Sequence, residues 1–214
     1  NLLLPAQYEA LADTMGRANI EEFDKNQINY FTREAFDFYY PGYGSSYPSV
    51  MGAVGMLTEQ GGIAGGRAIR TNDGYILTLR QRIFDHYTTS LATLKKSAER
   101  KDIFLKYTYE TLNPKNSKSK VKAYIFPNEP DGHLYELINI LLKHGVKIHQ
   151  AEDSFQVKNV TSYQRKNITN KTFTKGTFIV STDQARHLFI NSILSPNMAI
   201  EDSVMYDMST WAAP

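Results

Sequence analysis

The first stretch with a regular hydrophobic pattern runs from Pro5 to Lys25. Apolar side chains recur every three or four residues along it, at Tyr8, Leu11, Ala12, Met15 and Ile20. This spacing places them on one face of a helix, and a proline is well suited to a helix's first turn. We therefore expect an amphipathic helix here.

The pattern breaks between Asn29 and Ser49, where aromatic residues alternate with prolines and glycines and predict an irregular loop. The next run, VMGAVGMLTEQ (residues 50–60), is mostly apolar and predicts a short buried strand, whose glycines allow another backbone to approach closely. The glycine-rich stretch after it predicts a further irregular segment, with a turn at Asn72-Asp73-Gly74.

A second helical pattern begins at Thr78 and is expected to continue to about Tyr109. Its apolar positions share one face and charged residues occupy the other, which is typical of a helix that packs one side against a core. The apolar face contains Leu79, Ile83, Tyr87, Leu91, Leu94 and Ala98.

The polar stretch NPKNSKSK (residues 113–120) has no apolar anchor and predicts a linker. After it, VKAYIF, HLYELINILLKHG and VKIHQAE predict a strand, an amphipathic helix and a second strand. Such a βαβ unit places its two strands parallel to each other. Residues 155–180 predict further strands around a hairpin-like loop, and QARHLFINSILS predicts a short helix.

Composition narrows the class of protein. Hydrophobic residues make up 42% and charged residues 21% of the 214 residues, which is typical of a globular chain with a real core. A net charge of +2 does not indicate a nucleic-acid partner, and no apolar run is long enough to span a bilayer. With no cysteine, the chain has no disulfide, thiolate zinc site or cysteine nucleophile. Since it begins at Asn1 without a signal peptide, we expect a processed chain or an excised piece.

Glu59 is the candidate for chemistry, and the pattern leaves two interpretations open. The acid could end a strand and point into solvent, as most such residues do. It could also be a general base, because a carboxylate at the end of a buried strand is rigid and partly desolvated. The tyrosines upstream are equally open, since Tyr39 and its neighbours could pack as surface aromatics or donate hydrogen bonds into a cleft.

The run DFYYPGYGSSYPSVMGAVGMLTEQGG resembles the zinc carboxypeptidase family, the carboxypeptidase A-like metallopeptidases, and most closely a bacterial multidomain branch of it. The helix TLRQRIFDHYTTSLATLKKSAERK is similar to the family's C-terminal helix. VKAYIFPN…LLKHGVKI and DSVMYDMSTWAAP resemble the region that follows the peptidase domain in that branch, a class I glutamine amidotransferase-like domain. The resemblance covers nearly the whole chain.

This resemblance implies a role for each matching residue. Glu59 matches the general base, which activates a zinc-bound water and returns the proton to the leaving amine. Tyr39, or Tyr40 if the register slips by one, matches the mobile tyrosine that closes over the C-terminal substrate residue. Ser46 matches the position that sets side-chain preference, and its small neutral side chain does not favour a charged terminal residue.

The departures from the family are equally specific. The family holds zinc through an HxxE pair and a later histidine, all upstream of the tyrosine loop. The two HxxE sequences of this chain, His133–Glu136 and His149–Glu152, both lie downstream of that loop, and no histidine precedes His86. We therefore expect no metal site and no zinc in this chain alone, although the parent family uses zinc. The amidotransferase-like part lacks the cysteine nucleophile, so we expect it to be structural or ligand-binding.

Together these observations predict an α/β protein in two parts. Residues 1–112 are expected to be the C-terminal half of a mixed-sheet carboxypeptidase-like domain. Residues 113–120 form the linker, and residues 121–214 form a partial, flavodoxin-like amidotransferase domain. The expected function is hydrolysis of C-terminal peptide bonds by an exported parent protein, with a peptide as substrate. The alternative is a non-catalytic binding or structural module.

A severed half-domain would expose a sheet edge and apolar surface. We therefore expect a homodimer, or pairing with a missing N-terminal segment.

Overall fold

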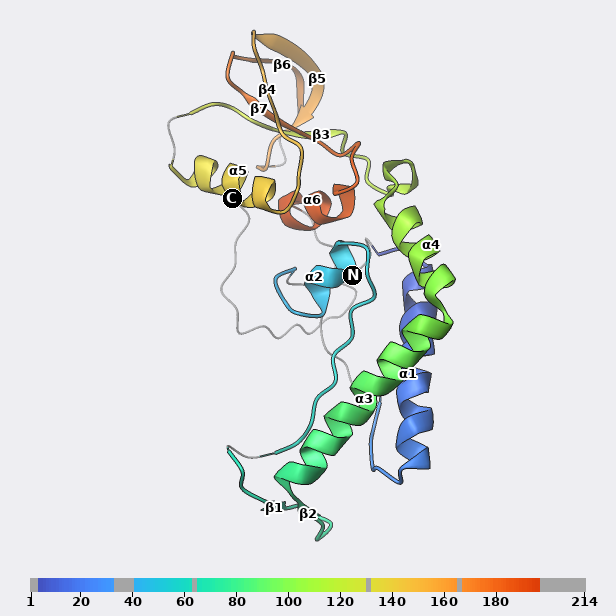
Figure 1. Ribbon diagram of the computed structural model, residues 1–214. Helices are drawn as coiled ribbons and strands as arrows, with labels where there is room; N and C mark the ends of the chain where they lie inside the picture. The colour runs from blue at the N-terminus through green and yellow to red at the C-terminus, as the bar shows by residue number, and fades with distance from the viewer. Residues whose placement is uncertain (1–3, 33–40, 63–64, 130–131, 165–166, 197–214) are drawn as a thin grey trace. The chain divides into compact units, whose positions relative to one another are not determined.

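The structure is a computed structural model, and it describes residues 4–32, 41–62, 65–129, 132–164 and 167–196 (Figure 1). The described residues divide into two compact units, with the division between Tyr109 and Glu110. Each unit contains helices and strands, so the protein is of the mixed α/β class. The two units are described separately below.

The first unit is mainly helical. Its elements, in chain order, are α1 (Gln7–Lys25), α2 (Ser46–Val50), β1 (Ile69–Arg70), β2 (Ile76–Leu77), α3 (Leu79–Glu99) and α4 (Lys101–Leu112), whose last turn enters the second unit. The two short strands form an antiparallel hairpin. Its turn contains Gly74 at φ +86°, a conformation that glycine adopts without strain, and this confirms the predicted turn.

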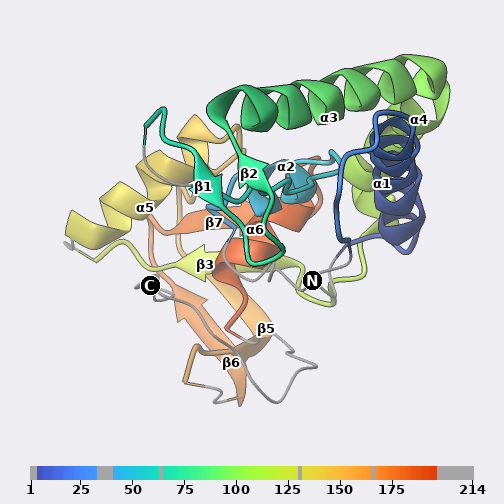
Figure 2. The ribbon, with the colours of Figure 1, turned by 90° about the horizontal axis from the view of Figure 1, so that it is seen from below.

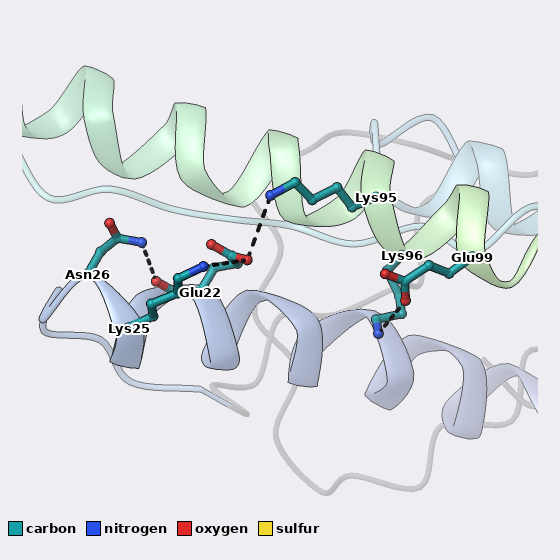
Figure 3. Close-up of polar contacts among 6 residues, drawn as sticks. All are labelled: Glu22, Lys25, Asn26, Lys95, Lys96 and Glu99. Carbon is teal, nitrogen blue, oxygen red and sulfur yellow. Dashed lines mark hydrogen bonds and ion pairs between the residues drawn. The ribbon is translucent and has the colours of Figure 1, made fainter.

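Helix α1 confirms the first hydrophobic pattern. Tyr8, Leu11, Met15 and Ala18 are its buried residues, at the three- and four-residue spacing of one helical face. The helix packs against α3, and Glu22 of α1 lies 3.8 Å from the ammonium of Lys95 on α3 (Figure 3). Lys95 is half exposed, so this ion pair contributes little to stability and mainly marks where the two helices meet.

The second helical pattern starts where the sequence predicts. The Thr78 hydroxyl accepts a hydrogen bond from the backbone N–H of Gln81, which caps the first turn of α3. The helical stretch ends at Leu112, close to the expected Tyr109, and is interrupted only at Arg100, between α3 and α4.

The side of α3 that faces inward differs from the prediction. Its buried residues are Asp85, Thr88, Thr89 and Ala92. Of the face predicted to pack, Tyr87 is 60% exposed and Leu94 is 68% exposed. The pattern therefore identified the apolar face of the helix, but most of that face is exposed rather than buried.

The predicted strand at residues 50–60 is wrong. Residues 46–50 form the short helix α2. Residues 51–62 form a turn followed by a segment without regular structure. A short apolar run fits a strand and a helix end equally well, and the contacts of Gly55 described below determine its path.

The second unit contains a three-stranded sheet, a separate hairpin and two helices. Its elements, in chain order, are a 3-10 turn (Pro114–Asn116), β3 (Ala123–Phe126), α5 (Gly132–Lys143), β4 (His149–Gln150), β5 (Phe155–Thr161), β6 (Asn167–Phe173), β7 (Phe178–Ser181) and α6 (His187–Leu194). Figure 2 shows β5 and β6 lying side by side as one hairpin.

The predicted βαβ unit is present in a split form. The sheet order is β3–β7–β4, and both outer strands run antiparallel to β7. Strands β3 and β4 are therefore parallel to each other, as expected, but β7 is inserted between them. Val180 at the centre of β7 has no exposed surface and lies opposite the buried Tyr124 of β3, so the core of this unit sits against the middle of the sheet.

Buried polar side chains fasten α6 within this unit. The amide oxygen of Asn191 accepts hydrogen bonds from the hydroxyls of Tyr124 (3.0 Å) and Ser119 (2.9 Å). The His187 ring lies on the same helix, with Nε2 2.9 Å from the Thr111 carbonyl oxygen, so Nε2 carries the proton and donates it. Because Tyr124, His187 and Asn191 are buried, the polar atoms of each depend on these partners.

The burial of His187 makes the stability of the chain depend on pH. Burial lowers the pKa of the imidazole below its usual value of about 6.5, and the hydrogen bond to Thr111 offsets part of this shift. The folded state therefore binds a proton less readily than the unfolded state. The free energy of unfolding should be at its full value above about pH 6.5 and should fall as the pH drops toward the lowered pKa.

Urea unfolding between pH 8 and pH 4.5 measures this effect. The amide in His187→Gln does not titrate. In this variant the free energy of unfolding should therefore fall less just below pH 6.5 than it does in the wild type. His133 is 90% exposed, so His133→Gln should retain the wild-type profile. Identical pH profiles for wild type and His187→Gln would contradict the assignment.

Candidate functional site

Glu59 lies in the segment without regular structure that follows α2, and its side chain is exposed. It belongs to no strand in the described part of the chain. What distinguishes the position is the backbone on either side, which is fixed to the helices of the first unit at Gly55 and at Gln60.

The upstream anchor is a buried hydrogen-bond cluster around Gly55. The Tyr8 hydroxyl on α1 donates a 2.7 Å hydrogen bond to the Gly55 carbonyl and lies 3.0 Å from Ser49 Oγ. Ser49 Oγ in turn donates to the Ser45 carbonyl and accepts from the Gly55 N–H. Burial raises the pKa of the Tyr8 phenol, so the group stays a hydrogen-bond donor at neutral pH.

Only glycine fits at this anchor. A Cβ atom on Gly55 would lie 1.8 Å from the Ser45 carbonyl oxygen and 2.7 Å from Ser49 Oγ. This is the close backbone approach expected at the glycines of this run. The neighbouring Gly52 carbonyl also accepts a hydrogen bond, of 2.9 Å, from the Thr108 hydroxyl on α4.

The downstream anchor is the buried carboxylate of Asp85. The Gln60 side-chain amide donates to its Oδ2 and the Gln81 amide donates to its Oδ1, at 2.5 and 2.6 Å. Asp85 is 7% exposed, so these amides replace the water that the carboxylate loses on folding. One turn away, Arg82 donates to the carbonyls of Gly65 and Arg67 and holds the rest of the glycine-rich segment to α3.

The other candidate residues are not gathered around Glu59. Tyr39 and Tyr40 lie outside the described residues. Ser46 is the first residue of α2 and is only 2% exposed, and its Oγ has no hydrogen-bond partner among the described residues. In this arrangement Ser46 belongs to the interior rather than to a surface that a substrate touches.

Metal ligands are not assembled in the described part of the chain, where no three His, Asp or Glu side chains come together. The described residues also contain no helix that is both long and apolar enough to cross a membrane. Within the described residues there is therefore no ligand group to compare with the zinc site that the family resemblance implies.

Comparison with known proteins gave no match to a family model, to a curated protein or to a solved structure. The carboxypeptidase-like assignment therefore remains a prediction from the motif around Glu59.

Sequence reasoning missed the residues that hold this segment. Asp85 was counted with the charged, outward side of α3, although an acid with a glutamine four residues before it on a helix is a recognisable pair. Tyr8 was recognised as a core position of α1. No local signal indicated that its hydroxyl reaches Gly55, 47 residues away along the chain.

Removing the Tyr8 hydroxyl should expose how much the upstream anchor contributes. Tyr8→Phe leaves the Gly55 carbonyl without this donor, and we expect a loss of about 1–3 kcal/mol in the free energy of unfolding, measured with urea. Tyr109 is 74% exposed, so Tyr109→Phe is the control and should change stability by less than about 0.5 kcal/mol. Equal losses of unfolding free energy in the two variants would show that the hydrogen bond from Tyr8 to Gly55 does not stabilise the fold.

Cutting the downstream anchor should loosen the backbone beside Glu59. Gln60→Ala removes one donor from the buried Asp85, and a glutamate-specific protease should then cleave after Glu59 several times faster than in wild type. Gln156 is exposed on β5, and Gln156→Ala is the matched control. An unchanged cleavage rate in Gln60→Ala would mean that the hydrogen bond to Asp85 does not restrain the segment.

Proposed function

We propose that this chain is part of a zinc-dependent metallocarboxypeptidase-like protein that hydrolyses C-terminal peptide bonds, with Glu59 as the general base. The resemblance of residues 37–62 to the family motif suggests the reaction. The observation that best supports Glu59 is that its exposed carboxylate lies between two backbone anchors, the cluster at Gly55 and the Gln60–Asp85 pair. A base needs this combination of fixed position and access to substrate.

The role of Glu59 follows from its chemistry. A carboxylate held within hydrogen-bond reach of a water can take the proton as that water attacks a peptide carbonyl, and can later deliver it to the leaving amine. The segment that carries Glu59 is held by hydrogen bonds on both sides. Its backbone would therefore lose little further conformational entropy during the reaction. In this proposal Tyr39 or Tyr40 contacts the substrate.

No histidine of this chain precedes the tyrosine loop, where the family has its zinc ligands, so we propose that the chain alone is inactive. The ligands would have to come from protein sequence upstream of Asn1. An HxxE pair followed by a later histidine in the coding sequence there would support the peptidase. By analogy with the family branch, we propose an exported, bacterial parent protein.

A non-catalytic binding or structural module derived from a peptidase is the second candidate. The observation that favours it is the burial of Ser46, because a residue that selects a substrate side chain has to be reached by that substrate. In this second proposal the cluster around Gly55 has a purely structural role.

The decisive variant is Glu59→Gln in the full-length protein that contains this chain. Release of C-terminal residues from peptides should fall by at least about 1,000-fold, because the amide cannot accept the proton, while bound zinc stays unchanged. Glu129 is also exposed, so Glu129→Gln is the control and should keep full turnover. Turnover that survives Glu59→Gln refutes the role of Glu59, and a wild-type protein without peptidase activity favours the non-catalytic module.

A further inference from the structure

One face of α3 is apolar and exposed. Phe84, Tyr87, Leu91, Leu94 and Ala98 follow one another at alternating spacings of three and four residues, which is the heptad pattern of helices that pair along a seam. Ile83 lies beside them. We refer to these six residues as the α3 seam, and Ile83, Phe84, Tyr87, Leu94 and Ala98 are exposed.

The seam lies opposite to the side of α3 that packs within the first unit. That inner side consists of Asp85, Thr88, Thr89 and Ala92, which lie half a helical turn away from it. A helix that buries its polar side and exposes its apolar side has reversed the usual arrangement. A single exposed apolar side chain is normal on a protein surface and needs no explanation. A continuous stripe of apolar side chains does need one.

The exposed area matches what a dimer requires. Ile83, Phe84, Tyr87 and Leu94 expose 61%, 41%, 60% and 68% of their surface. At about 200 Å² for each large side chain, this amounts to roughly 450 Å². A standard interface buries about 800 Å² on each partner, of which about 65% is apolar in homodimers.

Charge selects the partner. From Ile83 to Ala98 no member of the seam is charged, and the small polar residues beside it are Ser90 and Ser97. Asp85 is turned to the inner side, and Lys95 is directed at Glu22 of α1. A charged partner would therefore find no complement here, whereas two copies of the seam meet without repulsion between like charges.

We propose that two copies of this chain associate symmetrically through the α3 seam. A two-fold axis presents the same patch on both sides, so one self-complementary apolar stripe is enough to close the assembly. Tyr87, Leu91 and Leu94 form the centre of the interface, and Ser90, Ser97 and Lys95 lie at its rim. This inference uses no part of the proposed catalytic function.

Sedimentation velocity on the whole chain, at protein concentrations from about 1 to about 200 µM, tests the proposal. These concentrations cover the weak end of the affinities found for interfaces of this size. The wild type should sediment as a dimer at high concentration and dissociate on dilution. Leu94→Glu places a charge in the seam of both copies and should raise the dissociation constant by at least about 100-fold. Leu142 on α5 is 52% exposed, and Leu142→Glu is the matched control that should leave the dimer intact.

Circular dichroism verifies that the variants keep their helix content, and Tyr87→Lys provides a second substitution in the seam. A wild-type chain that remains monomeric at every concentration overturns the proposal. A dimer that persists in both Leu94→Glu and Tyr87→Lys places the interface elsewhere and overturns it as well. Because neither outcome involves peptide hydrolysis, failure here is separate from failure of the Glu59 assignment.

Discussion

The hydrogen bond from the Tyr8 hydroxyl to the Gly55 carbonyl joins the first helix of the chain to a segment that has no regular structure of its own. Residues 54–62 form no helix and no strand among the described positions, so their backbone groups depend on partners outside the segment. Tyr8 and Ser49 supply them at one end, and Asp85 receives the amide of Gln60 at the other. The position of Glu59 follows from these contacts.

The same contacts show where sequence reasoning succeeds and where it fails. Helix α1, the cap at Thr78, the turn at Gly74 and the β5–β6 hairpin were predictable, because each depends on residues close together in the chain. The path of residues 50–60 was not, because their apolar side chains and glycines suit several conformations, and contacts with α1 and α3 select among them. Tertiary packing overrides local preference most easily in such short runs.

Helix α3 shows that the buried face of a helix does not follow from its hydrophobic pattern alone. Periodicity determined which residues share a face, but it does not say which face meets the rest of the protein. Here Ala92 and two threonines are buried, and the burial of Asp85 is tolerated because two glutamine amides donate hydrogen bonds to it. The site was predicted less completely than the fold, since the pattern and the resemblance singled out Glu59, whereas the residues that hold its segment come from distant parts of the chain.

The insertion of β7 between β3 and β4 has a consequence for the order of events during synthesis. Strands β3 and β4 are made early, but neither has a neighbour in the sheet until the chain has been extended through Ser181. Until then the apolar residues of β3 and α5 have no sheet to cover. The three-stranded sheet therefore forms only after β7 has been made, through contacts distant in sequence, and a ribosome-bound chain that stops before β7 would be a natural client for chaperones.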